Sequence, residues 1–339
     1  MTANAQGDPP VSLSRPASVS ARQRMASTFL AMQERNLVVY LAFVAILVFF
    51  AIALSDRGFL TTDNLLNIIR QSAPITVMAV GVAFALSAGE IDLSVGSVVA
   101  LAALTSAVAL NEYGPLAGIL AGLGVGVVVG LVNGILTTKV RIPSFLVTLG
   151  MLGIVGGLAR RITNLQSVPV ENDFYTGLFG NGRLGPLSSL HLWAIVIVVL
   201  GHLVYRQTRF GAHVLATGGN RAAADHVGID TVRVKIGVLV VSATCAALAG
   251  MLYAGRLQGA RYTLGETDLL TVIAAVIIGG TSLFGGRGTI IGAAVGSIIM
   301  GMLNNGLILM GLDVSMQMIA RGGIIILAVA LSLREGAER

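Results

Sequence analysis

The 339-residue sequence has little charge and few residues that support covalent or metal chemistry. Charged residues make up 11% of the chain, against about 25% in a typical soluble domain. Cys245 is the one cysteine and lies in an apolar run, so no disulfide forms within the chain and a packing role is favoured. The four histidines have no metal-ligand spacing, and no Ser/His/Asp set is suggested by position. These shortages argue against an enzyme and against a metal site.

An ATP-binding P-loop is also missing. No Gly-x-x-x-x-Gly-Lys-Ser/Thr string occurs, and neither of the two lysines, Lys139 and Lys235, follows a glycine. The chain therefore cannot hydrolyse ATP through a P-loop. We expect no catalytic residues, metal or cofactor in this chain.

Hydrophobic residues make up 55% of the chain, and the mean hydropathy is +0.86. Because a bilayer core needs roughly 20 apolar residues as helix, the long apolar runs predict an all-α polytopic membrane bundle of about ten transmembrane helices. The predicted spans are Leu37–Leu54, Pro74–Ala88, Val95–Leu110, Pro115–Thr137, Phe145–Ala159, Leu190–Tyr205, Ile236–Tyr253, Leu269–Gly280, Thr289–Met310 and Met316–Leu333. Pro74–Ala88, Phe145–Ala159 and Leu269–Gly280 are short, which predicts broken or re-entrant segments around a pathway.

The polar ends divide the chain into three parts. Residues 1–36 are rich in Pro, Ser and Arg and predict a disordered cytoplasmic tail, followed by a transmembrane domain at 37–333 and a short tail at 334–339. The first apolar run has 18 residues, which fits an uncleaved helix better than a signal peptide. A sequence pI of about 10.0 does not indicate nucleic-acid binding, because most arginines stand singly at segment ends.

The distribution of basic residues predicts the orientation in the membrane. With ten spans, the loops on the side of the N-terminus hold the larger share of Lys and Arg. The positive-inside rule then places both termini in the cytoplasm, the long connection 160–189 outside, and the long connection 206–235 inside.

The string Gly89–Gly96 (Gly-Glu-Ile-Asp-Leu-Ser-Val-Gly) sets two carboxylates, Glu90 and Asp92, between apolar runs. Ionisable groups among membrane segments are costly and usually mark a pathway. A cytoplasmic turn and a re-entrant break both fit this string. Glu90 and Asp92 also support an alternative function, an ion-coupled secondary transporter.

A ladder of glycines predicts where helices pack closely. Positions four residues apart share one helix face, so glycines at this spacing leave a groove almost free of side chains. The ladder consists of Gly114, Gly118, Gly122, Gly126, Gly130 and Gly134.

The connection 206–235 contains the pattern of a short capped helix. Asn220 is a good N-cap and Gly228 a good residue just past the C-terminus. Between them, Arg221, Ala222, Ala223 and Ala224 would present a small-residue face suited to a groove on a partner, although a plain surface connection also fits.

Four strings in order resemble the permeases of ribose-type (ribose, xylose and arabinose) sugar importers of the ATP-binding cassette (ABC) class. Gly89–Gly96 resembles their Gly-Gly-Ile-Asp-Leu-Ser-Val-Gly string, and Gly279–Gly288 resembles their second glycine-rich signature. Asn304–Leu307 matches their Asn-Asn-Gly-Leu. Thr208–Ile229 is similar to their cytoplasmic coupling segment, with Ala222 where the general importer motif has Glu.

The resemblance implies a multi-pass permease of the bacterial inner membrane that imports a monosaccharide. It implies a homodimer, a separate cytoplasmic ATPase that holds ATP and magnesium, and a periplasmic solute-binding protein. It also implies that the coupling helix at 220–228 contacts that ATPase. An ABC permease for another solute, such as an amino acid, is a close alternative, and a membrane scaffold without solute flux is a more distant one.

The chain offers few polar groups to line a pathway for a sugar. Each of them equally suits a cap on a broken helix or a bridge between helices. The candidates are Glu90, Asp92, Ser94, Asn133, Asn304 and Asn305.

Overall fold

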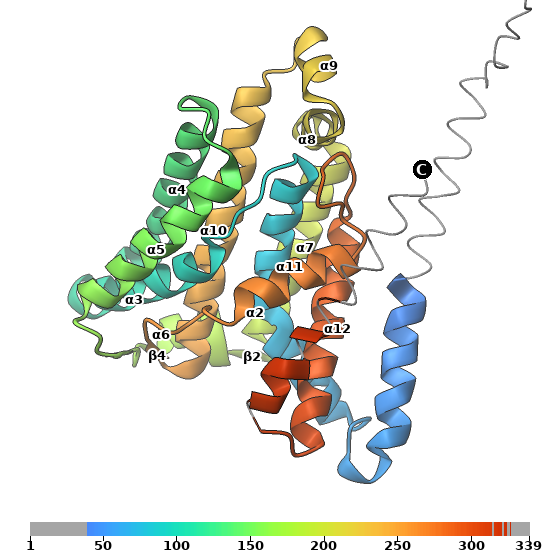
Figure 1. Cartoon of the computed structure of the whole chain (residues 1–339). Coiled ribbons are helices and arrows are strands. Elements are labelled where there is room, and N and C mark those ends of the chain that lie inside the picture. The colour runs from blue at the N-terminus through green and yellow to red at the C-terminus, as the bar shows by residue number, and fades with distance from the viewer. Residues whose placement is uncertain (1–38, 314, 321, 324–325, 327–339) are drawn as a thin grey trace, which may run out of the picture.

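The computed structural model describes residues 39–313, 315–320, 322–323 and 326 as a helical bundle (Figure 1). The predicted tails at 1–36 and 334–339, and most of the predicted span Met316–Leu333, lie outside the described residues. Within the described residues, seven helices are long and apolar enough to cross a membrane. They are α2 (Thr62–Ser87), α3 (Val95–Tyr113), α4 (Pro115–Thr138), α5 (Ser144–Ile162), α7 (Ser189–Gln207), α10 (Thr231–Leu257) and α12 (Ile290–Leu309). The predicted all-α membrane bundle is confirmed.

The described part of the chain also contains shorter elements. Two are apolar helices, Val39–Ala53 and α11 (Asp268–Ile278). The others are η1 (Ser55–Arg57), β1 (Val168–Pro169), α6 (Asp173–Thr176), η2 (Gly177–Asn181), β2 (Arg183–Leu184), β3 (Leu187–Ser188), α8 (Arg209–Gly219), α9 (Arg221–His226) and β4 (Gly259–Ala260). Strand β1 pairs antiparallel with β4, and β2 pairs antiparallel with β3.

The prediction of a short span at Pro74–Ala88 is wrong. Helix α2 begins twelve residues earlier, at Thr62, and has 26 residues with Pro74 inside it. The Thr61 hydroxyl caps its N-terminus by accepting a hydrogen bond from the backbone N–H of Asn64. Membrane helices tolerate an internal proline because neighbouring helices satisfy the freed backbone groups. The polar residues before Pro74 hid this part of the helix from a hydropathy reading. Phe145–Ala159 also lies within a longer helix, α5, whereas α11 has only 11 residues.

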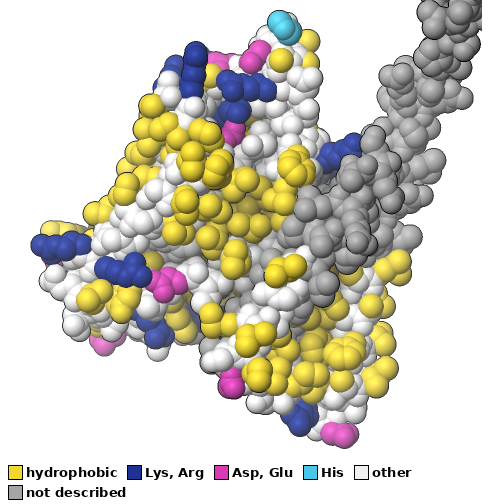
Figure 2. All heavy atoms as spheres, viewed as in Figure 1, with side chains coloured by type: hydrophobic (Ala, Val, Ile, Leu, Met, Phe, Trp, Pro, Cys, Tyr) yellow, Lys and Arg dark blue, Asp and Glu magenta, His cyan; other side chains and the backbone are white. Residues whose placement is uncertain are grey.

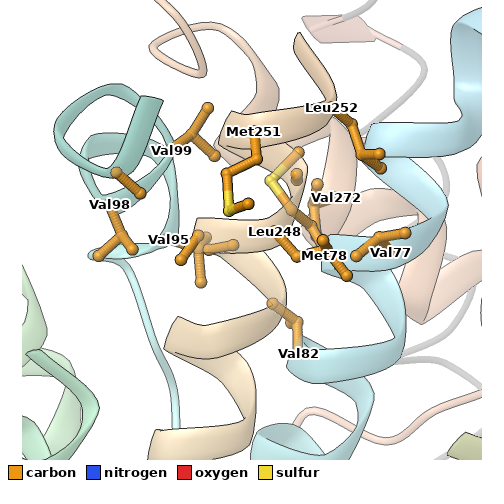
Figure 3. Packing of buried hydrophobic residues seen from close by; sticks show 14 of the residues in the cluster. Val77, Met78, Val82, Val95, Val98, Val99, Leu248, Met251, Leu252 and Val272 are labelled. Atoms are coloured by element: carbon orange, nitrogen blue, oxygen red, sulfur yellow. The ribbon is translucent and has the colours of Figure 1, made fainter. Parts of the chain in front are cut away.

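The two long connections lie at opposite ends of the bundle (Figure 1). Helices α8 and α9, from the connection 206–235, lie at one end, and α6 and the short strands lie at the other. Between the ends, α2, α3, α10 and α11 enclose the largest hydrophobic core. Figure 3 labels part of that core: Val77, Met78, Val82, Val95, Val98, Val99, Leu248, Met251, Leu252 and Val272.

The glycine ladder of α4 lies mainly against α10. A Cβ atom added to Gly130 would lie 2.5 Å from the Cα of Val240, and one added to Gly126 would lie 2.7 Å from the Cα of Thr244. Gly118 lies against α3 instead. Gly114 takes no part, because it precedes α4 with φ 88° and no atom lies within 4 Å of its Cβ position. Backbone-to-backbone contact of this kind fixes the distance between α4 and α10.

Candidate functional site

Helix α2 breaks at Gly89, and the chain continues in extended form to Ser94 before α3 begins. Gly89 has φ 78°, and the backbone N–H groups of Gly89 and Glu90 donate to the carbonyls of Leu86 and Ala85. This is the Schellman arrangement that ends many helices at a glycine. The break therefore starts at a left-handed conformation that favours glycine.

The extended segment is held by α5. The backbone N–H of Ile91 donates to the Ser144 hydroxyl at 3.1 Å, and the Thr148 hydroxyl donates to the Ile91 carbonyl at 3.0 Å. These bonds satisfy backbone groups that a helix would have paired internally, as a non-helical segment inside a membrane bundle requires.

Asp92, Ser94 and Asn133 form one buried polar cluster between α3, α4 and α10. One carboxylate oxygen of Asp92 accepts from the backbone N–H and the hydroxyl of Ser94, at 3.0 and 2.6 Å. The Asn133 amide donates to the same hydroxyl at 3.0 Å. Ser242 of α10 lies beside the carboxyl group. Asp92 thus stabilises the turn that leads into α3, and the Ser94 hydroxyl links Asp92 to Asn133 of α4.

The cluster keeps unused hydrogen-bonding capacity. Within the described structure, Asp92 Oδ2, Asn133 Oδ1 and Ser242 Oγ have no hydrogen-bond partner. Asp92 is 1% exposed and Asn133 is fully buried. Buried polar atoms without partners are uncommon and costly, so these three atoms set the cluster apart from the apolar core around it.

Glu90 has a partner that sequence reasoning missed. Its carboxylate forms an ion pair with Lys235 in the second turn of α10, and both side chains are largely buried. A buried lysine at the start of an apolar helix needs an anionic partner. Because lysine is rare in this sequence, Lys235 was a signal that could have pointed to an ion pair with Glu90. Glu90 therefore lies apart from the Asp92 cluster, nearer the end of the bundle that carries α8 and α9.

Asn304 and Asn305 lie at the other end of the bundle. Asn305 of α12 and Asn64 of α2 exchange two amide hydrogen bonds, each 3.0 Å long. Asn64 is 23 residues from the end of α2 at Ser87, which corresponds to about 35 Å of helix. The six candidate pathway residues therefore do not form one site, and Asn305 bridges two helices.

The coupling segment folds as two short helices. Asn220 caps α9, its side chain accepting from the backbone N–H of Ala223 at 3.0 Å, and Gly228 has φ 84° after its end. The predicted short helix is therefore present. Ala224 is buried against the bundle, whereas Ala222 and Ala223 are exposed. Arg221 pairs with Asp225 at 3.8 Å along the exposed side.

Glycines connect this segment to the helix break. The backbone N–H of Gly286 donates to the Ser87 carbonyl at 2.9 Å. A Cβ atom added to Gly218, in the last turn of α8, would lie 1.9 Å from the same carbonyl and 2.6 Å from the Gly286 N. We call Ser87, Gly89, Gly218, Gly285 and Gly286 the glycine junction. It joins the coupling segment, the α2 break and the loop before α12 without intervening side chains.

These features define a class before any comparison: a polytopic membrane bundle of broken helices, with a short capped helix, α9, at one end. In the described residues, no group of three His, Cys, Asp or Glu side chains could hold a metal ion. The chain belongs to the family described as "Branched-chain amino acid transport system / permease component", whose model matches residues 64–329.

Several of the similar proteins are named for a sugar. The chain is 36% identical to the ribose import permease protein RbsC of Escherichia coli over 320 residues, covering 92% of this chain and 97% of the relative. It is 36% identical to the L-arabinose ABC transporter permease protein AraH of Azospirillum brasilense, with 84% of each chain covered. It is 35% identical to the D-allose transport system permease protein AlsC of Escherichia coli, covering 85% of this chain and 89% of the relative. No solved structure matches the chain.

The comparisons confirm the resemblance to ribose-type permeases. The protein is a multi-pass permease component of the inner membrane, of the class that works with an ATPase and a periplasmic binding protein. They do not favour the ion-coupled alternative that was based on Glu90 and Asp92.

Proposed function

We propose that this chain is the membrane-spanning subunit of an ABC importer for a monosaccharide. The observation that carries the proposal is the near full-length similarity to permeases named for ribose, L-arabinose and D-allose. The family description names branched-chain amino acids, so an amino acid is the second candidate substrate. Recognition of sugar hydroxyls needs several fixed polar groups, and the bundle centre offers few. Specificity then resides mainly in the periplasmic binding protein.

The ATPase partner docks on α9 at the end of the bundle that carries the coupling segment. The exposed Ala222 and Ala223 and the exposed Val227 give α9 a small apolar face for a groove on that partner. ATP and magnesium bind to the partner, and closure of its nucleotide domains moves α8 and α9. The glycine junction passes this movement to the α2 break, which opens the pathway alternately to the two sides.

Within the membrane, the chain forms a dimer with a second copy of itself. The lipid-facing side of α5 suits it, because Gly150, Gly153 and Gly157 meet no atom within 4 Å and small residues let membrane helices approach closely. Both termini lie in the cytoplasm, on the side of α8 and α9, as the distribution of basic residues favours. The connection 160–189 faces the binding protein.

Affinity purification of the tagged chain from its native membranes tests the assembly. We expect a P-loop ATPase in stoichiometric amount, and the variant Ile154→Cys/Cys245→Ala to form a disulfide-linked dimer. Uptake by vesicles that contain the purified complex tests the substrate, with labelled ribose, L-arabinose, D-allose and leucine compared. ATP-dependent uptake of leucine alone contradicts the sugar assignment. Uptake that an ion gradient drives without ATP contradicts the importer assignment.

A further inference from the structure

A basic pocket lies where α4 ends and α5 and α10 begin. Its volume is about 430 Å³. The residues that carry the argument are Arg141, Arg221 and Lys235, with Glu90 and Thr137. Figure 2 shows Lys and Arg side chains gathered at the end of the molecule where α4, α5 and α9 lie in Figure 1.

The charges of this basic pocket favour an anion. Three cationic side chains line it against the one carboxylate of Glu90, which Lys235 already neutralises. Arg221 is about half exposed, and its one ion pair, to Asp225, is 3.8 Å long. No ion pair joins Arg141 to another described residue. The two guanidinium groups thus retain donors for a further anion.

The backbone and hydroxyl groups of the pocket point to the same ligand chemistry. Arg141 has φ 64°, a backbone conformation that residues other than glycine adopt rarely, and the turn between α4 and α5 places its side chain at the pocket. The hydroxyl of Thr137 lines the pocket, is buried, and has no hydrogen-bond partner among the described residues. The N-terminus of α5, a helix of 19 residues, also opens onto it and adds partial positive charge.

An apolar surface continues directly from this pocket along α4. Val128, Leu131 and Ile135 share one outward face and are 59%, 40% and 47% exposed. Val140, next to Arg141, is 57% exposed. A basic pocket at the end of membrane helices, continuous with an apolar helix face, matches a molecule with a phosphate headgroup and acyl chains.

We propose that the basic pocket binds the phosphate headgroup of an anionic phospholipid, with the acyl chains along the outer face of α4. The bound headgroup bridges the α4–α5 turn to α9 and the start of α10. The lipid therefore stabilises the position of the coupling segment in the membrane. This inference rests on the pocket and holds for either orientation of the chain in the membrane.

The test is lipid binding to the purified full-length chain. Native mass spectrometry and thermal unfolding are compared with added phosphatidylglycerol, phosphatidylcholine and inorganic phosphate. We expect phosphatidylglycerol to bind and to raise the unfolding midpoint more than phosphatidylcholine, and high salt to remove the difference. The double variant Arg141→Gln/Arg221→Gln is expected to bind phosphatidylglycerol about twenty-five-fold more weakly, from roughly fivefold per arginine.

Arg233→Gln is the matched control, since Arg233 lies at the same end of the bundle, is 88% exposed and does not line the pocket. It should leave binding unchanged. Equal binding of the two lipids by the wild type overturns the proposal. So does a loss of phosphatidylglycerol binding that is as large in the control as in the double variant. If inorganic phosphate stabilises the protein and phosphatidylglycerol adds no further effect, the pocket binds free phosphate. That result overturns the proposal of a lipid ligand. If the double variant does not fold, the proposal is still tested on the wild type, by comparing the two lipids at low and high salt.

Discussion

Glu90, in the extended segment after α2, forms a buried ion pair with Lys235 of α10. The pair fastens the broken connection between α2 and α3 to the helix that follows the coupling segment. Taking two charges out of water is costly, and the cost is recovered only while both partners remain.

Lys235→Met is therefore expected to destabilise the protein by about 3–5 kcal/mol, because it removes the ion-pair partner of a carboxylate whose side chain is only 4% exposed. The double variant Glu90→Gln/Lys235→Met should recover most of this loss. Thermal unfolding in detergent measures both. The exposed pair Asp230–Arg233 serves as control, and Arg233→Ala should cost no more than about 1 kcal/mol. A double variant as unstable as Lys235→Met would contradict the role assigned to the pair.

Asp92 is expected to act through its shape and hydrogen bonds, not through its charge. Asn at position 92 still accepts from Ser94, and its new amide donors lie beside Ser242, whose hydroxyl has no partner among the described residues. Asp92→Asn should keep stability and uptake, whereas Asp92→Ala should lose about 1.5–3 kcal/mol. Loss of uptake by a stable Asp92→Asn variant would show that the pathway needs the charge.

The glycine ladder predicts a position-dependent effect of one methyl group. Gly130→Ala places a Cβ atom 2.5 Å from the Val240 Cα, so α4 and α10 must separate, at a cost of about 1–3 kcal/mol. Gly124→Ala in the same helix meets no atom within 4 Å and should be neutral. Unfolding midpoints of the two variants provide the comparison, and equal midpoints would contradict the packing argument.

The glycine junction predicts a second matched pair. Gly218→Ala would bring a Cβ atom to 1.9 Å from the Ser87 carbonyl, so α8 must move away from the α2 break. We expect ATP-dependent uptake to fall at least tenfold while ATP hydrolysis by the assembled complex persists. Gly219→Ala, whose Cβ position is 3.8 Å from the nearest atom, should transport normally. If both variants transport equally well, the junction does not transmit movement.

The backbone conformation of Gly228 provides a test of whether the end of α9 matters for uptake. With φ 84°, a β-branched residue is strained there, whereas Asn adopts this conformation at little cost. Gly228→Val should lower ATP-dependent uptake and association with the ATPase while insertion into the membrane persists. Gly228→Asn should retain both. Unchanged uptake by Gly228→Val would remove the coupling role from α9.

Local signals in the sequence determined a large part of this protein. Long apolar runs dictate membrane helices because a helix alone satisfies its backbone groups within lipid. Asn220 and Gly228 determined α9 because caps act within a few residues of themselves. Glycines at a spacing of four marked the face of α4 that approaches α10. Four ordered strings were enough to identify the family.

Contacts between distant segments were decided only by the tertiary structure. No local rule pairs Glu90 with Lys235, or Asn64 with Asn305, because such pairs depend on which helices become neighbours. The first half of α2 is polar, and α12 supplies a partner for Asn64 there, so hydropathy placed the start of the helix too late. Gly114 fits the spacing of the ladder and yet precedes the helix, because α4 starts at Pro115. Spacing and composition determine which residues lie on one face of a helix, and tertiary packing determines which neighbouring helix contacts that face.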